Sequence, residues 1–273
     1  MWTQIVGKIR MAHTPMLNHW WHVTLYPTAR GLTTSAVPYG DGAFEIEFDF
    51  LRHRLHLRST GGGSAVVELA PKTVAAFYRE TLDALAGLGV PARIHAVPNE
   101  VERAVPFADD EVHHSYDGAA AQLFWRQLVQ AERVMSRTRF EFLGKQSPVH
   151  FFWGAMDLAY TRFSGRTAPQ HPGGAPNCPP SVMHEAYSHE LASVGFWPGG
   201  GEEGAFYAYA YPEPAGYPQR TPFYDASARE LILPYEKVAA APDPDAVLTD
   251  FLRTAYEAAA DLGGWDRVAL ERG

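Results

Sequence analysis

Apolar and charged residues alternate along the segment from Ala43 to Phe50. A period of two places all the apolar side chains on one face of an extended chain, which predicts a half-buried antiparallel strand. A hairpin that turns at Leu51 and Arg52 would bring acidic residues opposite basic ones, and cross-strand attraction would stabilise this register. The predicted pairs are Asp49 with Arg54, Glu47 with His56, and Glu45 with Arg58.

A similar order of elements recurs in the two halves of the chain. In each half, period-two segments predict strands, and an amphipathic segment after them predicts a helix. The sequence therefore predicts an α+β protein of two pseudo-repeated halves, each an antiparallel sheet followed by a packed helix. Strands 43–50 and 205–211 are then expected to occupy equivalent places. The predicted strands are 22–26, 33–37, 43–50 and 55–57, then 150–158, 191–197, 205–211 and 231–233; the predicted helices are 73–86 and 246–260.

The halves extend over residues 19–98 and 148–262, and a helix over residues 119–137 is expected to join them within one compact unit of residues 1–273. An aspartate at the N-cap position indicates where two helices begin. These residues are Asp117 for the joining helix and Asp243, which a proline follows, for the last helix.

Tyrosines occupy every second position of the predicted strand 205–211, which places them on one face. Phenylalanine and alanine occupy the other face. The tyrosine face is expected to lie beneath a neighbouring helix, and a ligand-binding wall is the alternative.

Composition excludes several classes of protein. Of the 273 residues, 46% are hydrophobic, yet no apolar run approaches the roughly 20 residues of a membrane-spanning helix. The net charge of −8 argues against non-specific binding of nucleic acid, which needs clustered basic residues. One cysteine, Cys178, leaves no intrachain disulfide or thiolate metal cage. With no signal-peptide pattern at the start, a cytoplasmic location is expected.

The first candidate site lies in the segment His184–Glu190. Its histidines do not have the spacing of a zinc-protease helix, but Glu185 and His189 are four residues apart, which predicts that they share one side of a helix or a strand. A carboxylate beside an imidazole can bind a metal or act as an acid–base pair. A structural hydrogen bond is the alternative.

The second candidate site precedes the joining helix and contains His113, His114 and Tyr116. The N-terminus of a helix attracts anions, and two histidines there can also bind a metal. A solvated entry loop is the alternative.

The third candidate site combines His150, Trp153 and Asp157 with two arginines, Arg162 and Arg166. If 150–158 is one strand, Asp157 continues the face of Trp153. Buried polar groups among aromatic residues need hydrogen bonds, so these residues form either a structural network or the wall of a pocket. We expect Arg162 to pair with Asp157 or another acid, and Arg166 to be accessible to an anion.

Several linked motifs resemble those of an uncharacterised bacterial family, domain of unknown function 5996. The resemblance covers nearly the whole chain and implies one stand-alone unit, but no activity is established for the family. The motifs are His113–Asp117, Ser147–Gly154 with Asp157 and Leu158, Arg162–Arg166, Tyr187–Glu190, Gly195–Gly199, Ala208–Pro214 and Leu233–Tyr235.

Two functions fit these observations. The first is an enzyme that acts on a small polar or anionic molecule through a pocket between the halves, with or without a divalent metal. The second is a ligand-binding or sensor protein that uses the same pocket; neither function involves nucleic acid or a membrane. The expected catalytic residues are His189, Glu185, His150 and Asp157; the expected ligand-binding residues are His113, Tyr116, Trp153, Arg162 and Arg166; the metal candidates are His113, His150, Glu185 and His189.

Overall fold

The computed structural model describes residues 1–199 and 204–272 and confirms an α+β fold with two antiparallel sheets. The chain forms two compact units. The first contains residues 1–129, 151–155 and 174–180; the second contains residues 130–150, 156–173 and 181–273. Boundaries between them fall inside α3 (Gly118–Thr138) and inside β7 (His150–Phe152).

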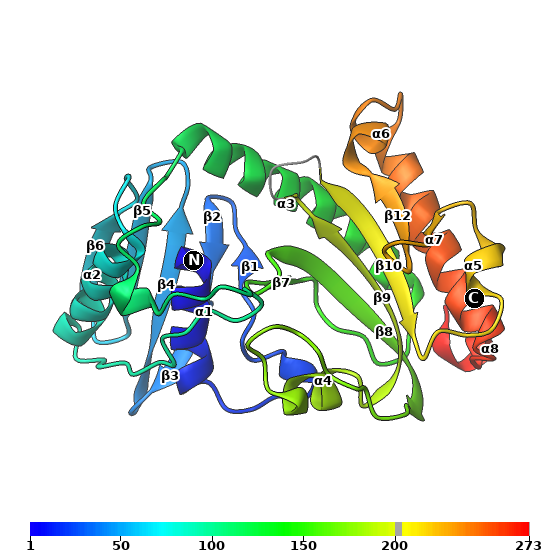
Figure 1. The fold of residues 1–273 in the computed structure, drawn as a ribbon, viewed down its shortest axis with the longest axis horizontal. Helices are drawn as coiled ribbons and strands as arrows, with labels where there is room; N and C mark the ends of the chain where they lie inside the picture. The colour runs from blue at the N-terminus through cyan, green and yellow to red at the C-terminus, as the bar shows by residue number, and fades with distance from the viewer. Residues whose placement is uncertain (200–203, 273) are drawn as a thin grey trace. The chain divides into compact units, whose positions relative to one another are not determined.

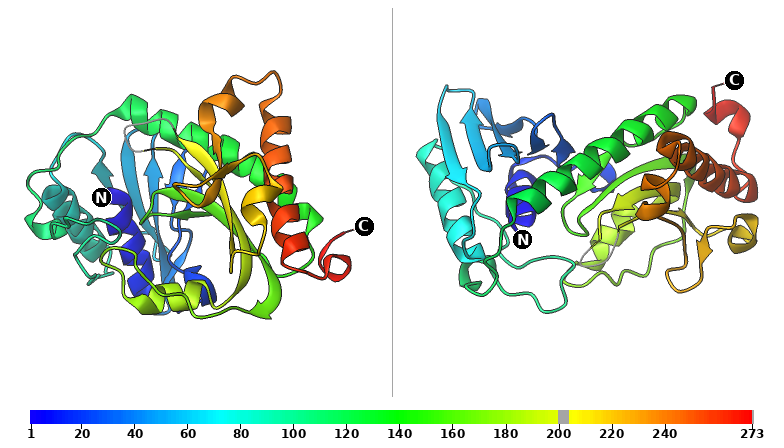
Figure 2. Two further views of the ribbon diagram at one scale, coloured as in Figure 1. Left: turned by 45° about the vertical axis from the view of Figure 1, so that its right-hand side comes forward. Right: turned by 90° about the horizontal axis from the view of Figure 1, so that it is seen from above.

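The first unit is a sheet with two helices, α1 and α2 (Figures 1 and 2). Its strands follow the order β1-β2-β4-β5-β6, and β3 also pairs with β4. One face of the sheet is apolar and buried, with Ile46 opposite Leu57 and Phe48 opposite Leu55. The bounds are α1 (Trp2–His13), β1 (Tyr26–Pro27), β2 (Gly31–Thr33), β3 (Val37–Tyr39), β4 (Gly42–Asp49), β5 (Arg54–Ser59), β6 (Ser64–Glu68) and α2 (Val74–Gly87), with short helical turns η1 (Asn18–Trp20) and η2 (Phe107–Asp109).

The predicted β4–β5 hairpin is confirmed residue by residue. Asp49 lies opposite Arg54, Glu47 opposite His56, and Glu45 opposite Arg58. Asp49 also closes the turn, because its Oδ1 accepts hydrogen bonds from the backbone N–H groups of Leu51 (3.0 Å) and Arg52 (2.9 Å). Its Oδ2 lies 2.6 Å from Nε of Arg30. This buried carboxylate therefore joins the hairpin to the start of β2.

Asp49→Ala is expected to lower the free energy of unfolding by about 2–4 kcal/mol, because it leaves two turn N–H groups and a guanidinium without their acceptor. Urea unfolding followed by tryptophan fluorescence measures the loss. The matched control is Glu68→Ala, which removes an exposed ion pair with Arg54 and should cost less than about 1 kcal/mol. Equal losses in the two variants would contradict the role given to Asp49.

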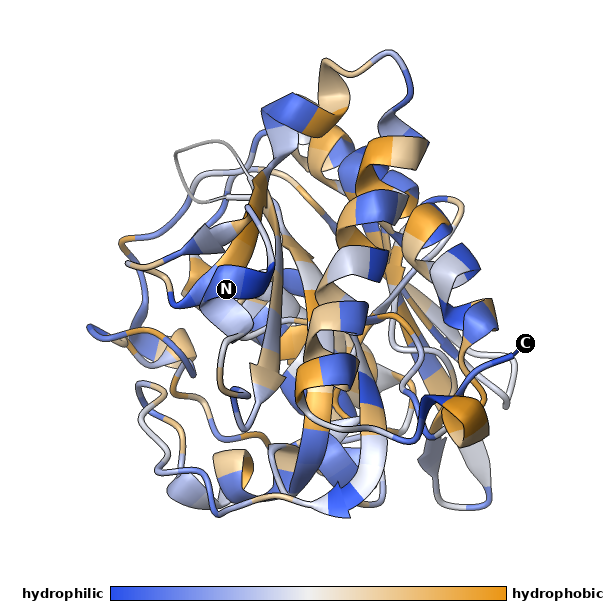
Figure 3. Ribbon diagram, turned by 90° about the vertical axis from the view of Figure 1, so that its right-hand side faces the viewer, coloured by the Kyte–Doolittle hydropathy of each residue, from blue (hydrophilic) through white to orange (hydrophobic). Residues whose placement is uncertain are grey.

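The second unit is a sheet with strand order β11-β12-β10-β9-β8 and α7 packed on one face. Figure 2 shows α7 beside these strands, and polar and apolar residues alternate along it in Figure 3, as in an amphipathic helix. The buried side of α7 includes Phe251 and Ala255. The bounds are η3 (Arg139–Glu141), β8 (Asp157–Thr167), α4 (Pro180–Ala186), β9 (His189–Trp197), β10 (Ala205–Tyr211), α5 (Tyr217–Arg220), β11 (Tyr224–Asp225), β12 (Glu230–Pro234), α6 (Tyr235–Ala239), α7 (Pro244–Leu262) and α8 (Arg267–Leu270).

The predicted helices are confirmed, and their caps agree with the sequence. Oδ1 of Asp117 accepts hydrogen bonds from the first turn of α3, and Asp243 accepts one from Ala246 at the start of α7. The N-terminal helix α1 was not expected, although its apolar side is buried at Ile5 and Ile9. No helix in the described part of the chain is both long and apolar enough to span a bilayer.

One predicted strand is interrupted by a turn. The segment 150–158 is not one strand, because residues 153–156 form a turn in which Met156 has a left-handed φ of 64°. Counted back from the helix that follows, β4 and β10 are each the third strand. The equivalence of strands 43–50 and 205–211 stays a prediction, and the short strands β6 (after Gly61–Gly63) and β11 were not predicted.

Candidate functional site

The candidate residues fall into both units. His113, Tyr116 and Trp153 belong to the first unit, whereas His150, Asp157, Arg162, Arg166, Glu185 and His189 belong to the second.

His113 is exposed and anchored by a buried acid. Its Nδ1 lies 2.8 Å from Oδ2 of Asp110, whose side chain is 1% exposed against 60% for His113. Burial by itself would raise the pKa of Asp110, but hydrogen bonds from the His113 backbone and ring outweigh burial and hold this pKa below its usual value. This arrangement orders the loop before α3.

Tyr116 and Trp153 make structural contacts in the first unit. The hydroxyl of Tyr116 lies 2.9 Å from Nδ1 of His53, and its ring stacks on Trp2. Nε1 of Trp153 donates a hydrogen bond of 2.8 Å to the carbonyl oxygen of Val23, and this side chain is 6% exposed. Both polar atoms are thus engaged by residues of the same unit.

Glu185 and His189 do not share one regular element. α4 ends at Ala186, and His189 begins β9, so the four-residue spacing does not act as a helical or strand repeat. Ser188 links them: its Oγ donates to the carbonyl oxygen of Glu185 (3.0 Å) and lies 3.0 Å from Nδ1 of His189. The prediction that Glu185 and His189 share one side of a helix or a strand is therefore wrong.

The expectation for the two arginines is met in accessibility but not in pairing: Arg166 is the more exposed one, yet it is also the one that forms an ion pair. Arg162 lies on the face of β8 opposite Asp157, and no ion pair to it occurs in the described residues. It is 3% exposed, its guanidinium lies 4.3 Å from the ring centroid of Tyr256, and it donates to the carbonyl oxygen of Thr138 (2.6 Å). Arg166 is the paired arginine, because it lies 2.6 Å from Oε2 of Glu190.

The tyrosine face of the second sheet is the face opposite α7. Arg162, which contacts Tyr256 of α7, alternates along β8 with Asp157 and Thr161, so these two residues point to the other side. Register places Thr161 beside Ser193 and Ser193 beside Tyr209. The expectation that a helix covers the tyrosines is not met by α7, which packs on the Phe206 and Ala208 side.

One hydrogen bond on this face joins β10 to β8 across the intervening strand β9. Tyr207 on β10 pairs with Gly195 on β9, and its hydroxyl donates a short hydrogen bond to Oδ2 of Asp157 on β8. Gly195 makes this possible, because a Cβ at this position would lie 2.2 Å from Cζ of Tyr207. The tyrosine ring lies over the glycine, and the missing side chain lets it reach the carboxylate.

Asp157 is a carboxyl group with a strongly shifted pKa. Burial raises the pKa of Asp157 to about 6, and the hydrogen bond from Tyr207 offsets only part of this effect. Burial, and next the charge of Asp157, raise the pKa of Tyr207 well above its usual value, so the phenol keeps its proton. Burial and then Asp157 also raise the pKa of Glu230, which alternation along β12 places on the same face.

Further hydroxyl groups line the tyrosine face. The hydroxyls of Tyr187 and Tyr209 lie 2.9 Å apart, and those of Thr161 and Ser193 lie 3.0 Å apart. The ring of His171 stacks on Tyr187 with a centroid distance of 4.5 Å. The face therefore combines one acid of near-neutral pKa with polar groups that can orient a ligand.

The described residues contain no cluster of potential metal ligands. Within residues 1–199 and 204–272, no three His, Cys, Asp or Glu side chains are placed to hold a metal ion. His150, a metal candidate, is 1% exposed at the start of β7.

Sequence reasoning found Asp157 but missed its partners, Tyr207, Gly195 and Glu230. The signal for Tyr207 is the tyrosine alternation itself. The signal for Gly195 is a glycine inside the apolar strand 191–197, a position that commonly marks close approach of another group. Glu230 carries no local signal, since only the register of β12 brings it to this face.

Comparison with known proteins yields one match. A search of curated proteins finds no match, and neither does a search of solved structures. A family model described as "Family of unknown function (DUF5996)" matches residues 1–272, in agreement with the motifs noted in the sequence. The chain belongs to this family of unknown function, DUF5996.

Proposed function

We propose that the protein is an enzyme that acts on a small polar molecule by acid–base catalysis on the tyrosine face of the second unit. The observation that carries this proposal is the Asp157–Tyr207 pair, a carboxyl group with a pKa of about 6 held by a phenol across Gly195. Asp157 is buried (8% exposed), and strongly shifted pKa values of such groups often mark catalytic sites.

In this proposal, Asp157 accepts a proton from the substrate and returns it later in the cycle. A pKa near the working pH suits this role, because the group is then ionised often enough to act as a base and can still be protonated. Tyr207 engages Oδ2 and keeps its own proton, so it orients the carboxylate without competing as a base.

The charge on this face favours a neutral or cationic substrate. Among the described residues of β8, β9, β10 and β12, no lysine or arginine shares the face with Asp157 and Glu230, because Arg162 points to the α7 side and Arg166 is held by Glu190. The hydroxyl groups of Tyr187, Tyr209 and Ser193 supply hydrogen bonds to a polar molecule. A cytoplasmic substrate pool agrees with the single cysteine of the chain.

Incubation of the purified protein with a polar-metabolite extract, followed by mass spectrometry, tests the proposal. The wild type should consume a metabolite, and Asp157→Asn should slow its consumption at least about 100-fold, the usual contribution of a general base. Tyr207→Phe should retain part of the activity and shift its pH profile upward, because the hydrogen bond that lowers the pKa of Asp157 is lost. The control is Glu236→Gln, which alters an exposed acid of α6.

Unchanged consumption in Asp157→Asn would refute the catalytic role. If no metabolite is consumed but one raises the melting temperature of the wild type, the protein is a ligand-binding or sensor protein instead.

A further inference from the structure

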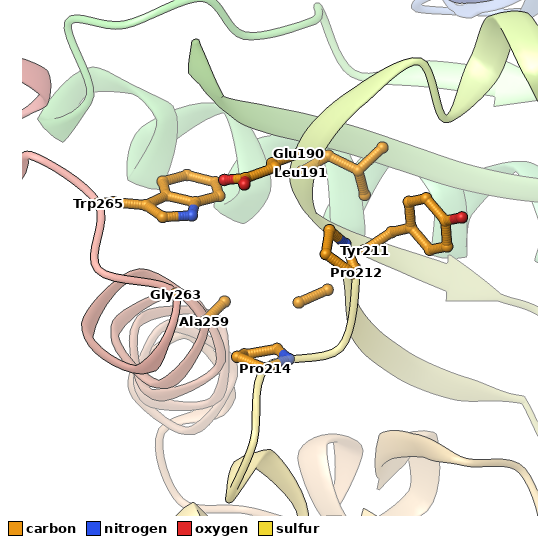
Figure 4. A pocket seen from close by; sticks show the side chains of 9 residues that line it. Glu190, Leu191, Tyr211, Pro212, Pro214, Ala259, Gly263 and Trp265 are labelled. Atoms are coloured by element: carbon orange, nitrogen blue, oxygen red, sulfur yellow. The ribbon is translucent and has the colours of Figure 1, made fainter. Parts of the chain in front are cut away.

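An open pocket lies in the second unit between the ends of β9 and β10 and the C-terminal end of α7 (Figure 4). Its cavity volume is about 100 Å³, below the roughly 300–1,000 Å³ of sites for drug-sized molecules, so it suits a ligand no larger than a single ring. Most of its lining is apolar, as in sites that bind the body of a small ligand. The apolar lining includes Ala210, Pro212, Pro214, Ala259 and Trp265.

This pocket is separate from the tyrosine face. Ala210 alternates along β10 with Tyr209 and Tyr211, so its side chain points to the α7 side of the sheet. Figure 4 shows the ring of Tyr211 directed away from Trp265 and Ala259. A ligand here would therefore leave the Asp157 side of the sheet untouched.

Glu190 contributes a carboxylate to the pocket lining, and its charge is already balanced by Arg166. Its Oε2 accepts hydrogen bonds from Nε of Arg166 (2.8 Å) and from Oγ of Ser164 (2.9 Å). Arg166 also donates to the carbonyl oxygens of Gly263 (2.6 Å) and Gly264 (2.9 Å) at the end of α7, so all three of its nitrogens are already engaged by the protein. The ion pair leaves the polar end of the pocket close to neutral.

One acceptor at this polar end is available to a ligand. Across residues 1–199 and 204–272, Oε1 of Glu190 has no hydrogen-bond partner, and the side chain is 21% exposed. At the same end of the pocket, Trp265 offers an aromatic surface (Figure 4). An acceptor beside an apolar, uncharged wall selects a ligand with one hydrogen-bond donor and an apolar body.

We infer that this pocket binds a small neutral molecule with a single apolar or aromatic ring and one hydroxyl or N–H donor, which donates to Oε1 of Glu190. A cationic ligand is disfavoured by the adjacent Arg166, and an anionic one by Glu190. The site differs in position and in ligand class from the acid–base site proposed above.

Titration with phenol, followed through the indole N–H resonance of Trp265, tests this inference. Trp265→Phe assigns the resonance among the seven tryptophans. Phenol should shift it with saturation in the millimolar range, whereas anisole, which has no donor, should bind at least tenfold more weakly. Benzoate and benzylammonium should also bind more weakly than phenol.

A pair of strand variants locates the binding. Ala210→Leu fills the pocket and should abolish the phenol-induced shift, whereas Ala205→Leu makes the same change in the same strand outside the lining and should preserve it. Asp157→Asn should bind phenol like the wild type, so failure of the acid–base proposal would leave this result intact. A phenol response that is absent, equal in Ala210→Leu, or weaker than that of either charged analogue overturns the inference; the analogue series decides the matter even if Ala210→Leu does not fold.

Discussion

Gly195→Ala is expected to lower the free energy of unfolding by about 2–4 kcal/mol, since it combines overpacking with the loss of a hydrogen bond to a carboxylate. The new methyl group would lie 2.2 Å from Cζ and 2.3 Å from the hydroxyl oxygen of Tyr207. The ring must move away, and the hydrogen bond to Asp157 breaks. Urea unfolding measures the loss, and Gly87→Ala is the control, because no heavy atom lies within 4 Å of the Cβ added there.

A double-mutant cycle separates this clash from any general effect on β9. In the Tyr207→Ala background the ring is gone, so Gly195→Ala should cost less than about 1 kcal/mol. In the Tyr207→Phe background the ring remains, and most of the cost should persist. If the cost of Gly195→Ala is the same in all three backgrounds, Tyr207 does not require this glycine.

The free energy of unfolding of Asp157→Asn, measured relative to that of the wild type, is expected to increase by up to about 3 kcal/mol between pH 4 and pH 7. The pKa of Asp157 is raised from the usual 3.8 to about 6. Between these two values the folded protein holds the proton more tightly than the unfolded chain, so stability falls as the pH rises through this window. Asparagine carries no such proton, and the variant escapes the loss.

Unfolding in urea at pH 4, 5, 6 and 7 measures the difference between the two proteins. Asp49→Asn should show the opposite pH dependence. Burial alone would raise the pKa of Asp49, but the hydrogen bonds from Arg30 and from the backbone N–H groups of Arg52 and Leu51, with the charge of Arg30, together outweigh burial and lower this pKa. The carboxylate of Asp49 therefore stabilises the fold at neutral pH, and the wild type should lose this advantage over Asp49→Asn as the solution becomes acidic. A difference for Asp157→Asn that stays constant with pH would show that the pKa of Asp157 is not raised.

Local patterns predicted the secondary structure well where neighbours in sequence are also neighbours in space. Alternation from Ala43 to Phe50, with a turn directly after it, was sufficient for the register of the β4–β5 hairpin. Capping by Asp117 and Asp243 placed the starts of α3 and α7. In these cases the interactions that decide the structure lie within a few residues, so the sequence pattern contains them.

The same kind of reasoning failed where a turn, which the sequence pattern did not reveal, interrupted a predicted strand or helix. The turn at residues 153–156 ended the predicted strand 150–158, and the junction between α4 and β9 separated Glu185 from His189. Residue spacing predicts which side chains share a face only within one helix or strand, and the prediction does not extend across a turn.

By itself, the sequence determined the α+β class, the main helices, one hairpin register and the family. The tertiary structure alone decided which polar groups meet. Asp157 and Tyr207 are 50 residues apart, and Arg166 and Glu190 are 24 apart. Each pair depends on the register of strands that lie far apart in the sequence, and the Asp157–Tyr207 pair also depends on Gly195 between the two residues. Such contacts arise from the packing of the whole sheet, so no local pattern around Asp157 or Arg166 could specify their partners.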